Sequence, residues 1–213
     1  MHSTSSLRGL KSGFQGDVLT PDDPGYDEAR AVFNATIDRH PAFIARCVGP
    51  DDVVRAVEFA RRENMHLSVR GTGHNVAGFA VCEGGLVIDL SRMKGVAVDA
   101  SKHTVRAEGG CTWGEVNDAL QPHGLAATGG FVSITGVSGL TLGGGLGWLV
   151  RKHGLALDNL LSAQVVLADG RIVTASPQEN GDLFWAIRGG GGNFGVVTSF
   201  EFRAHAVGTV FAG

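Results

Sequence analysis

The sequence has 213 residues, 43% hydrophobic and 18% charged, so it can bury a sizeable core and lacks the composition of a disordered chain. A net charge of -3, with no basic run longer than Arg61-Arg62, excludes the electrostatic footprint of a nucleic-acid-binding protein and makes a small molecule the expected partner. The absence of an apolar leader or of 18 consecutive apolar residues predicts a cytoplasmic protein with no membrane contact.

Cysteine and glycine contents are also informative. Cys47, Cys82 and Cys111 are far apart and have no CxxC spacing, so we expect reduced, buried thiols rather than disulfides or metal ligands. Glycine accounts for 33 residues, roughly twice its usual ~7% share, without a collagen-like period. The excess must serve local backbone geometry.

The first third of the chain predicts helix, strand and loop in that order. Residues 1–40 form a polar lead-in with a helix over about 27–37. The stretch "GPDDVVRAVEFARREN" (49–64) carries its apolar residues on one face, which predicts an amphipathic helix. The strand "HLSVR" (66–70) then delivers the chain into the glycine-rich loop "GTGHNVAG" (71–78).

Short β-rich runs follow at 85–90, 95–100 and 103–109 and predict one small sheet. Thr112, three residues before Glu115, predicts a helix that begins with a capping box.

The last third predicts a hairpin and a helix followed by a strand. "LLSAQVVLADGRIVTA" (160–175) has a turn signal at Asp169-Gly170, and "DLFWAIR" is followed by "GGGGNFG" and "VVTSFEF". Because helices and strands do not alternate as regular βαβ units, the fold class is α+β.

The spacing of Gly190, Gly192 and Gly195 matches the dinucleotide pattern G-x-G-x-x-G, but its context is reversed. A nucleotide fingerprint follows a strand and opens a helix, whereas here a helix precedes the glycines and a strand follows. The chain also lacks the lysine of a phosphate-binding P-loop motif. We therefore set aside the Rossmann interpretation.

Two other glycine-rich stretches can each be interpreted in more than one way. "RGTGHN" (70–75) can turn backbone N–H groups toward an anion, or it can be an ordinary turn whose histidine bonds nearby backbone. "TGVSGLTLGGGLGWL" (135–149) has too many glycines for a stable helix or strand, which favours a broad ligand lying on bare backbone. Its leucines and tryptophan are either walls of that site or simply core.

The stretches beginning at Ser68, Thr128 and Gly189 together resemble the FAD-binding domain shared by vanillyl-alcohol oxidase, p-cresol methylhydroxylase and berberine bridge enzyme. The bacterial berberine-bridge-like branch is the most similar. The resemblance implies a two-subdomain FAD-binding domain of the p-cresol methylhydroxylase type, with FAD bonded covalently to His74. It places the lead-in at 1–40 and the FAD-binding domain at 41–213, divided into subdomains of about 41–110 and 111–213.

The resemblance also implies which residues hold the cofactor. Phosphate contacts fall on the first glycine loop, the ribityl chain and flavin edge on the second glycine stretch, and the adenosine or phosphate end on two later residues. The residues of the first group are Arg70, Gly71, Thr72, Gly73, His74, Asn75 and Gly78. Those of the second group are Gly130, Thr135, Gly136, Gly139, Leu140, Gly143, Gly144, Gly145 and Gly147. The two later residues are Asn159 and Val197.

Some features of the family are missing here. Plant-type members carry a second covalent link through a cysteine, and Val132 stands in that place, which implies attachment through His74 alone. Family members continue into a substrate-binding domain that this sequence lacks, and no residue is a convincing catalytic base or metal ligand.

Three functions remain open from the sequence. One is the FAD domain of an oxidoreductase that oxidises an alcohol, sugar, amine or alkaloid-like carbon and passes electrons to O2 or another acceptor. The others are a flavin-binding module without turnover and a nucleotide binder without flavin.

Overall fold

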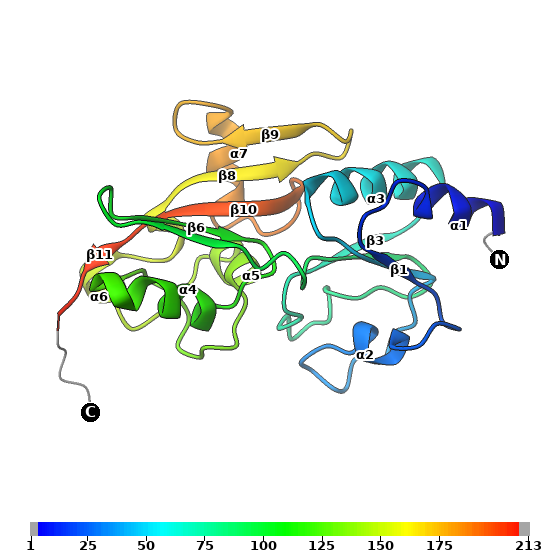
Figure 1. The fold of residues 1–213 in the computed structure, drawn as a ribbon, viewed down its shortest axis with the longest axis horizontal. Helices are drawn as coiled ribbons and strands as arrows, with labels where there is room; N and C mark the ends of the chain where they lie inside the picture. Colours follow the sequence, from blue (N-terminus) through cyan, green and yellow to red (C-terminus); the bar gives the residue numbers. More distant parts are fainter. Residues whose placement is uncertain (1–3, 209–213) are drawn as a thin grey trace.

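The computed structural model describes residues 4–208 and contains two lobes that lie side by side, each built on its own β-sheet (Figure 1). The first lobe contains the helices α1 (Thr4–Lys11), α2 (Tyr26–Arg30) and α3 (Pro50–Arg62) and the strands β1 (Asp17–Leu19), β2 (Phe43–Arg46), β3 (Leu67–Arg70) and β4 (Leu86–Asp89). The second lobe contains β5 (Val96–Asp99), β6 (Thr104–Glu108), α4 (Trp113–Leu120), β7 (Leu125–Ala126), α5 (Val137–Leu142), α6 (Val150–His153), β8 (Leu160–Val166), β9 (Ile172–Ala175), α7 (Gly181–Ile187), β10 (Val196–Arg203) and β11 (His205–Ala206), with 3-10 turns at Gln121–His123 and Leu157–Asn159.

The sheet of the first lobe has the strand order β1-β2-β4-β3, in which β2, β4 and β3 run parallel. All four residues of β4 are buried, as expected for a strand with helices packed on both faces. The helix α3 covers one face, and α2 covers the other through Tyr26 and Ala29. The paired strand ends Arg70 and Asp89 therefore lie at the carboxyl edge of this sheet, where the first glycine loop begins.

The helix α3 confirms the amphipathic pattern of 49–64. Its first turn contains Asp52, which is 2% exposed and accepts hydrogen bonds from the backbone N–H groups of Gln15, Gly16 and Val48 at 2.8–3.1 Å. A single carboxylate thus joins the helix to the strands β1 and β2.

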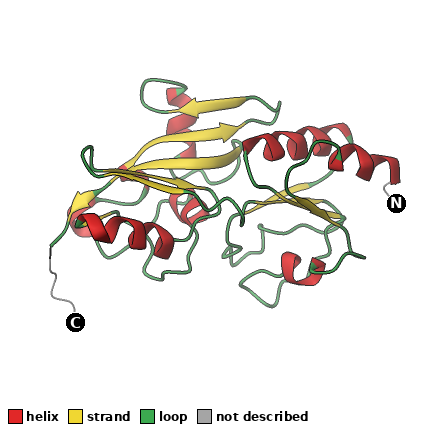
Figure 2. Ribbon diagram, viewed as in Figure 1, coloured by secondary structure: helices red, strands yellow, loops and turns green. Residues whose placement is uncertain are grey.

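The second lobe is an antiparallel sheet of order β5-β6-β10-β8-β9, seen as the larger group of yellow arrows in Figure 2. Its main core surrounds Trp113, Phe200 and Phe202, all fully buried. The predicted hairpin is confirmed as β8 and β9, and α4 begins with the predicted capping box of Thr112 and Glu115.

Two expectations about the elements are wrong. The helix predicted for 27–37 is only α2, because Ala31 is already extended and Asn34 closes a turn on Thr36 and Ile37. The three runs at 85–109 do not form one sheet, because β4 pairs inside the first lobe whereas β5 and β6 pair in the second. A subdomain division at about residue 110 stays a prediction. The last strand of the first sheet ends at Asp89, and the first strand of the second sheet begins at Val96.

The three cysteines are free and buried, as expected. Burial raises the pKa of the Cys111 thiol to about 11 and that of Cys47 further still. Within residues 4–208, no helix combines the length and apolar character that crossing a membrane requires, and no group of three metal-ligating side chains occurs.

Candidate functional site

The first glycine loop leaves the carboxyl end of β3 and folds back on itself before β4. Gly73 and Gly78 have φ values of 79° and 77°, which side chains other than glycine rarely adopt. Asn75 closes the turn, since its side-chain oxygen accepts from the N–H of Phe79 at 3.0 Å and its carbonyl from that of Gly78 at 3.0 Å. The loop is therefore ordered by its own hydrogen bonds.

The imidazole ring of His74, which belongs to this loop, is held by two contacts. Its Nδ1 atom lies 2.9 Å from the hydroxyl of Thr72, and its ring stacks on Phe33 with 4.9 Å between ring centroids and 23° between planes. The Nε2 atom is buried and has no hydrogen-bond partner among the described residues. Leaving a buried polar atom unpaired costs free energy, so this nitrogen is a natural place for a bound group.

The Arg70 side chain makes a hydrogen bond inside the protein. Its guanidinium donates to the carbonyl oxygen of Ala29, at the end of α2, and its Nε atom is buried. The charge therefore fastens the lead-in to β3, and a phosphate contact from this side chain stays a prediction.

The two glycine-rich stretches are in direct contact across the junction of the lobes. A Cβ added to Gly71 would lie 2.4 Å from the hydroxyl oxygen of Ser138, and one added to Gly136 would lie 2.4 Å from that of Thr72. Ser138 in turn donates to the carbonyl of Gly109 at 2.9 Å. Each glycine leaves room for a hydroxyl of the other stretch. The loop that carries His74 therefore packs closely against the start of α5.

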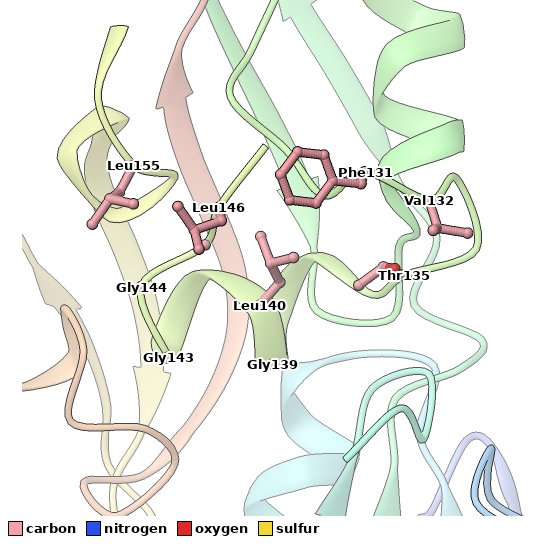
Figure 3. Close-up of a pocket in the computed structure, with 10 residues that line it drawn as sticks. Phe131, Val132, Thr135, Gly139, Leu140, Gly143, Gly144, Leu146 and Leu155 are labelled. Carbon is pink, nitrogen blue, oxygen red and sulfur yellow. The ribbon is translucent and has the colours of Figure 1, made fainter. Parts of the chain in front are cut away.

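An open groove of about 690 Å³ runs along α5, starting beside that contact. Leu140 projects from α5 toward the side chains of Leu146 and Phe131, as Figure 3 shows. Thr135 lies at one end of the groove, next to Gly136. Gly136 packs against Thr72, whose hydroxyl contacts His74, so His74 is close to this end but does not line the groove. The lining consists of Phe131, Val132, Thr135, Gly139, Leu140, Gly143, Gly144, Gly145, Leu146 and Leu155, none of which has a titratable side chain.

The glycines of the groove fall into two groups. A Cβ on Gly139 would meet nothing within 4 Å, and one on Gly143 or Gly144 would meet atoms only at 3.4–3.8 Å. A Cβ on Gly145 would instead lie 2.5 Å from Ala156, and one on Gly147 would lie 1.6 Å from the carbonyl oxygen of Gly129. The first three glycines line the groove and have room for a Cβ, whereas the last two make room for the chain itself.

Asn159 is buried and its side chain is fully used inside the protein. Its amide donates to the carbonyls of His153 and Leu155 at 2.9 and 2.8 Å, and its oxygen lies 2.7 Å from Nε2 of His205. The rings of His153 and His205 are stacked, with 3.7 Å between centroids. Asn159 therefore anchors the segment that carries Leu155 to the groove.

The remaining predicted positions pack against other parts of the chain, and their contacts with the cofactor stay predictions. A Cβ on Gly130 would lie 3.0 Å from Leu140, and one on Gly78 would lie 2.8 Å from Ile37 of the lead-in. Val197 is buried in the main core, and its carbonyl would lie 2.6 Å from a Cβ on Gly109. Val132, by contrast, is 56% exposed on the groove wall.

Sequence reasoning missed several residues of the site. The polar composition of the lead-in gives Phe33 no role, although an aromatic residue outside any apolar periodicity is a signal available there. Ser138 and Leu155 became visible only once the chain was folded, because Ser138 contacts Gly109, 29 residues away, and Leu155 shares the groove with Phe131, 24 residues away.

Comparison with known proteins decides the family. A family model described as an FAD binding domain matches residues 41–176, which is more than half of the chain. The chain belongs to this FAD-binding family. The resemblance inferred from the three motifs and the α+β fold of the p-cresol methylhydroxylase type are both confirmed.

The relatives are FAD-linked oxidoreductases. An FAD-linked oxidoreductase of Aspergillus terreus, pgmH, is 43% identical over 96% of this chain and 42% of its own length. The structure of 6-hydroxy-D-nicotine oxidase from Arthrobacter nicotinovorans has a TM-score of 0.89 and 39% identity, covering 91% of this chain and 43% of that one. The structure of glucooligosaccharide oxidase from Acremonium strictum, described with a 6-S-cysteinyl, 8α-N1-histidyl FAD, has a TM-score of 0.88 and 37% identity. The match covers 94% of this chain and 42% of that one.

The cofactor of this family is FAD, and the residues present fit it. Gly139, Gly143 and Gly144 leave a strip of bare backbone along an apolar groove, which suits a flat ring system. The unpaired Nε2 of His74 belongs to the first glycine loop, which contacts the start of α5. The chain spans less than half the length of the curated relatives it matches.

Proposed function

We propose that this chain holds FAD through a covalent bond to His74 and provides the cofactor-binding part of an oxidase or dehydrogenase for a small alcohol, sugar, amine or alkaloid-like substrate. The observation that carries the proposal is the placement of His74, whose ring is fixed on two sides while its Nε2 atom stays unpaired. When bound, FAD supplies the two-electron oxidation that no side chain can perform.

The imidazole has the nucleophilic nitrogen that such a bond requires. Bonding replaces one C–H bond of the flavin 8α methyl group and the N–H bond of His74 with a single C–N bond. Dioxygen takes up the two hydrogens and becomes hydrogen peroxide, so atoms and electrons balance. With Val132 at the groove wall, this chain offers no sulfur for a second bond there.

The groove residues have complementary roles in this proposal. The bare backbone of Gly139 and Gly143 lets a ring system lie close to α5, and Leu140 and Leu146 exclude water from its face. The backbone N–H groups of the first glycine loop are the candidates for the phosphates.

The proposed substrate class is supported by the relatives, which include a nicotine-derivative oxidase and a sugar oxidase. Their names also support dioxygen as the electron acceptor. Because the groove lacks a titratable side chain, the group that accepts the substrate proton is expected outside the groove, in a region such as the additional length that the relatives have. We therefore expect the isolated chain to bind FAD but to turn over substrate poorly.

Acid precipitation of purified protein tests the attachment. Flavin fluorescence should stay with the wild-type pellet, and His74→Ala should release all of it to the supernatant. His123→Ala, which changes an exposed histidine of the second lobe, is the matched control and should keep its flavin. Acid-stable flavin in His74→Ala protein would refute the assignment.

The groove also favours a second candidate, a flavin-binding module without turnover, because its lining offers no proton acceptor. Anaerobic addition of a panel of sugars, alcohols and amines to the flavin-loaded protein separates the two. Bleaching of the flavin absorbance supports the oxidoreductase, and an unchanged spectrum across the panel supports the module.

A further inference from the structure

The segment 29–39, which we call the strap, crosses the first glycine loop on the side of Phe33. It lies outside residues 41–176, where the family model matches, and neither motif nor periodicity gave it a function. Its contacts with the loop are nevertheless dense.

Backbone and side-chain hydrogen bonds fix the strap to the last residue of β3 at one end, and to the loop in the middle and at the other end. Arg70 donates to the carbonyl of Ala29, and the N–H of Phe33 donates to the carbonyl of Gly73 at 3.1 Å. The amide of Asn34 donates to the carbonyl of Val76 at 2.8 Å, and Arg39 donates to the carbonyl of Gly78 at 2.9 Å. These bonds leave the strap little freedom to slide along the loop.

The strap brings one side chain to the proposed site. The ring of Phe33 stacks on the imidazole of His74 but is itself 64% exposed, so it contributes little to the buried core. An exposed aromatic ring that lies face to face with one imidazole restricts the rotation of that imidazole about χ2. The hydroxyl of Thr72 restricts the same ring in its own plane through Nδ1.

We infer that Phe33 is a positioning residue, which holds the His74 imidazole in the orientation needed for bonding to the flavin. The inference rests on the proposed function, since it concerns the same histidine. Phe33 acts on the rate of attachment rather than on affinity for FAD, because it is not part of the groove.

The test uses the 213-residue chain prepared without flavin, to which FAD is then added. Phe33→Ala should slow the appearance of acid-stable flavin by about tenfold or more, since small misplacements of a reacting group cost rate steeply. Rapid quenching of FAD fluorescence, which reports non-covalent binding, should stay unchanged. Phe33→Tyr keeps the ring and should restore the wild-type rate.

Phe79→Ala is the matched control. Phe79 directly follows the first glycine loop and is 71% exposed, so its removal changes a comparable surface without touching the stack. Attachment in this variant should proceed at the wild-type rate. Equal slowing of Phe79→Ala and Phe33→Ala, or an unchanged rate in Phe33→Ala, would overturn the inference.

A second measurement needs no flavin. In the apoprotein, the ring protons of His74 should show a ring-current shift in NMR spectra that Phe33→Ala removes and Phe33→Tyr retains. If wild-type protein forms no covalent flavin, the proposed attachment fails, and the NMR comparison still shows whether Phe33 holds the ring. Ring-proton shifts that are identical in Phe33→Ala and wild type would refute the positioning role itself.

Discussion

The two glycine-rich regions of the molecule, residues 71–78 and 139–147, use their missing side chains differently. In the first region the glycines make room for the protein, since Gly71 faces Ser138 and Gly78 faces Ile37. In the second, a Cβ on Gly139 would meet nothing within 4 Å and one on Gly143 would make only ordinary contacts at 3.4 Å or more, and both glycines line the groove. The atoms that a Cβ would meet, rather than the density of glycines, distinguish a packing glycine from one that leaves room for a ligand.

The second region contains both kinds, which allows the distinction to be tested within a few residues. Gly145 and Gly147 support the turn, whereas Gly139 and Gly143 support the proposed cofactor contact. Gly144 is unsuitable for this test, because its φ of 119° would strain any side chain whether or not a ligand lies beside it.

The largest expected effect is at Gly147. Gly147→Ala places a methyl group 1.6 Å from the carbonyl oxygen of Gly129, so the backbone must move, at a cost of about 3 kcal/mol or more. Thermal or urea unfolding should show this loss as a lower midpoint. Gly192→Ala is the control, because a Cβ there meets nothing within 4 Å, and its stability should change by about 0.5 kcal/mol at most. Equal stability of the two variants would contradict the packing role.

A smaller but more specific effect is expected at Gly139. Gly139→Val puts a branched side chain into the groove, where no protein atom lies within 4 Å. Because glycine and valine both favour helices weakly, the free energy of unfolding of the flavin-free protein should change by about 0.5 kcal/mol at most. FAD binding to the flavin-free chain, measured by fluorescence quenching, should weaken by about tenfold or more, which corresponds to about 1.4 kcal/mol. Normal FAD affinity in a stable variant would show that the open space has no role in binding.

The smallest effect concerns how the second region is anchored. Burial is the main cause that lowers the pKa of His205, and the neighbouring His153 lowers it further. His205 contacts Asn159, which anchors the segment carrying Leu155. The folded protein therefore binds this proton less readily than the unfolded chain. The contribution to stability is full above the usual histidine pKa of 6.5 and is lost as the pH falls below it.

Thermal unfolding at about pH 7.5 and about pH 5.5 measures this contribution. His205→Gln should reduce the drop in midpoint between the two values, because glutamine does not titrate. His123→Gln, at an exposed site, should retain the wild-type drop. An unaltered drop in His205→Gln would assign the pH dependence to other groups.

Local signals in the sequence predicted much of the fold. The helix α3, the capping box of Thr112 and Glu115, and the hairpin of β8 and β9 each depend on residues close together in the chain, so their patterns were sufficient. The pairing of β4 was not predictable in this way, because its partners β2 and β3 are chosen by burial in a parallel sheet.

The candidate site was predicted less completely, for a related reason. The glycine stretches and His74 stand out in the sequence, and the resemblance to a family supplied their roles. The contact of Gly71 with Ser138 and the stack of Phe33 on His74 join segments 67 and 41 residues apart, and no local pattern encodes them. Likewise, the hydrogen bonds that occupy Arg70 and Asn159 appear only in the folded chain.

The central position of β10 has a consequence for synthesis on the ribosome. The first sheet is complete once Asp89 has emerged, but the second waits for residues 196–203, which lie between β6 and β8. Until then, the hairpins β5–β6 and β8–β9 are separate two-stranded units, which are marginal in water and expose unpaired edges. The nascent chain therefore passes through a long interval with one lobe formed and the other vulnerable to aggregation, and slower growth at low temperature should raise the soluble yield.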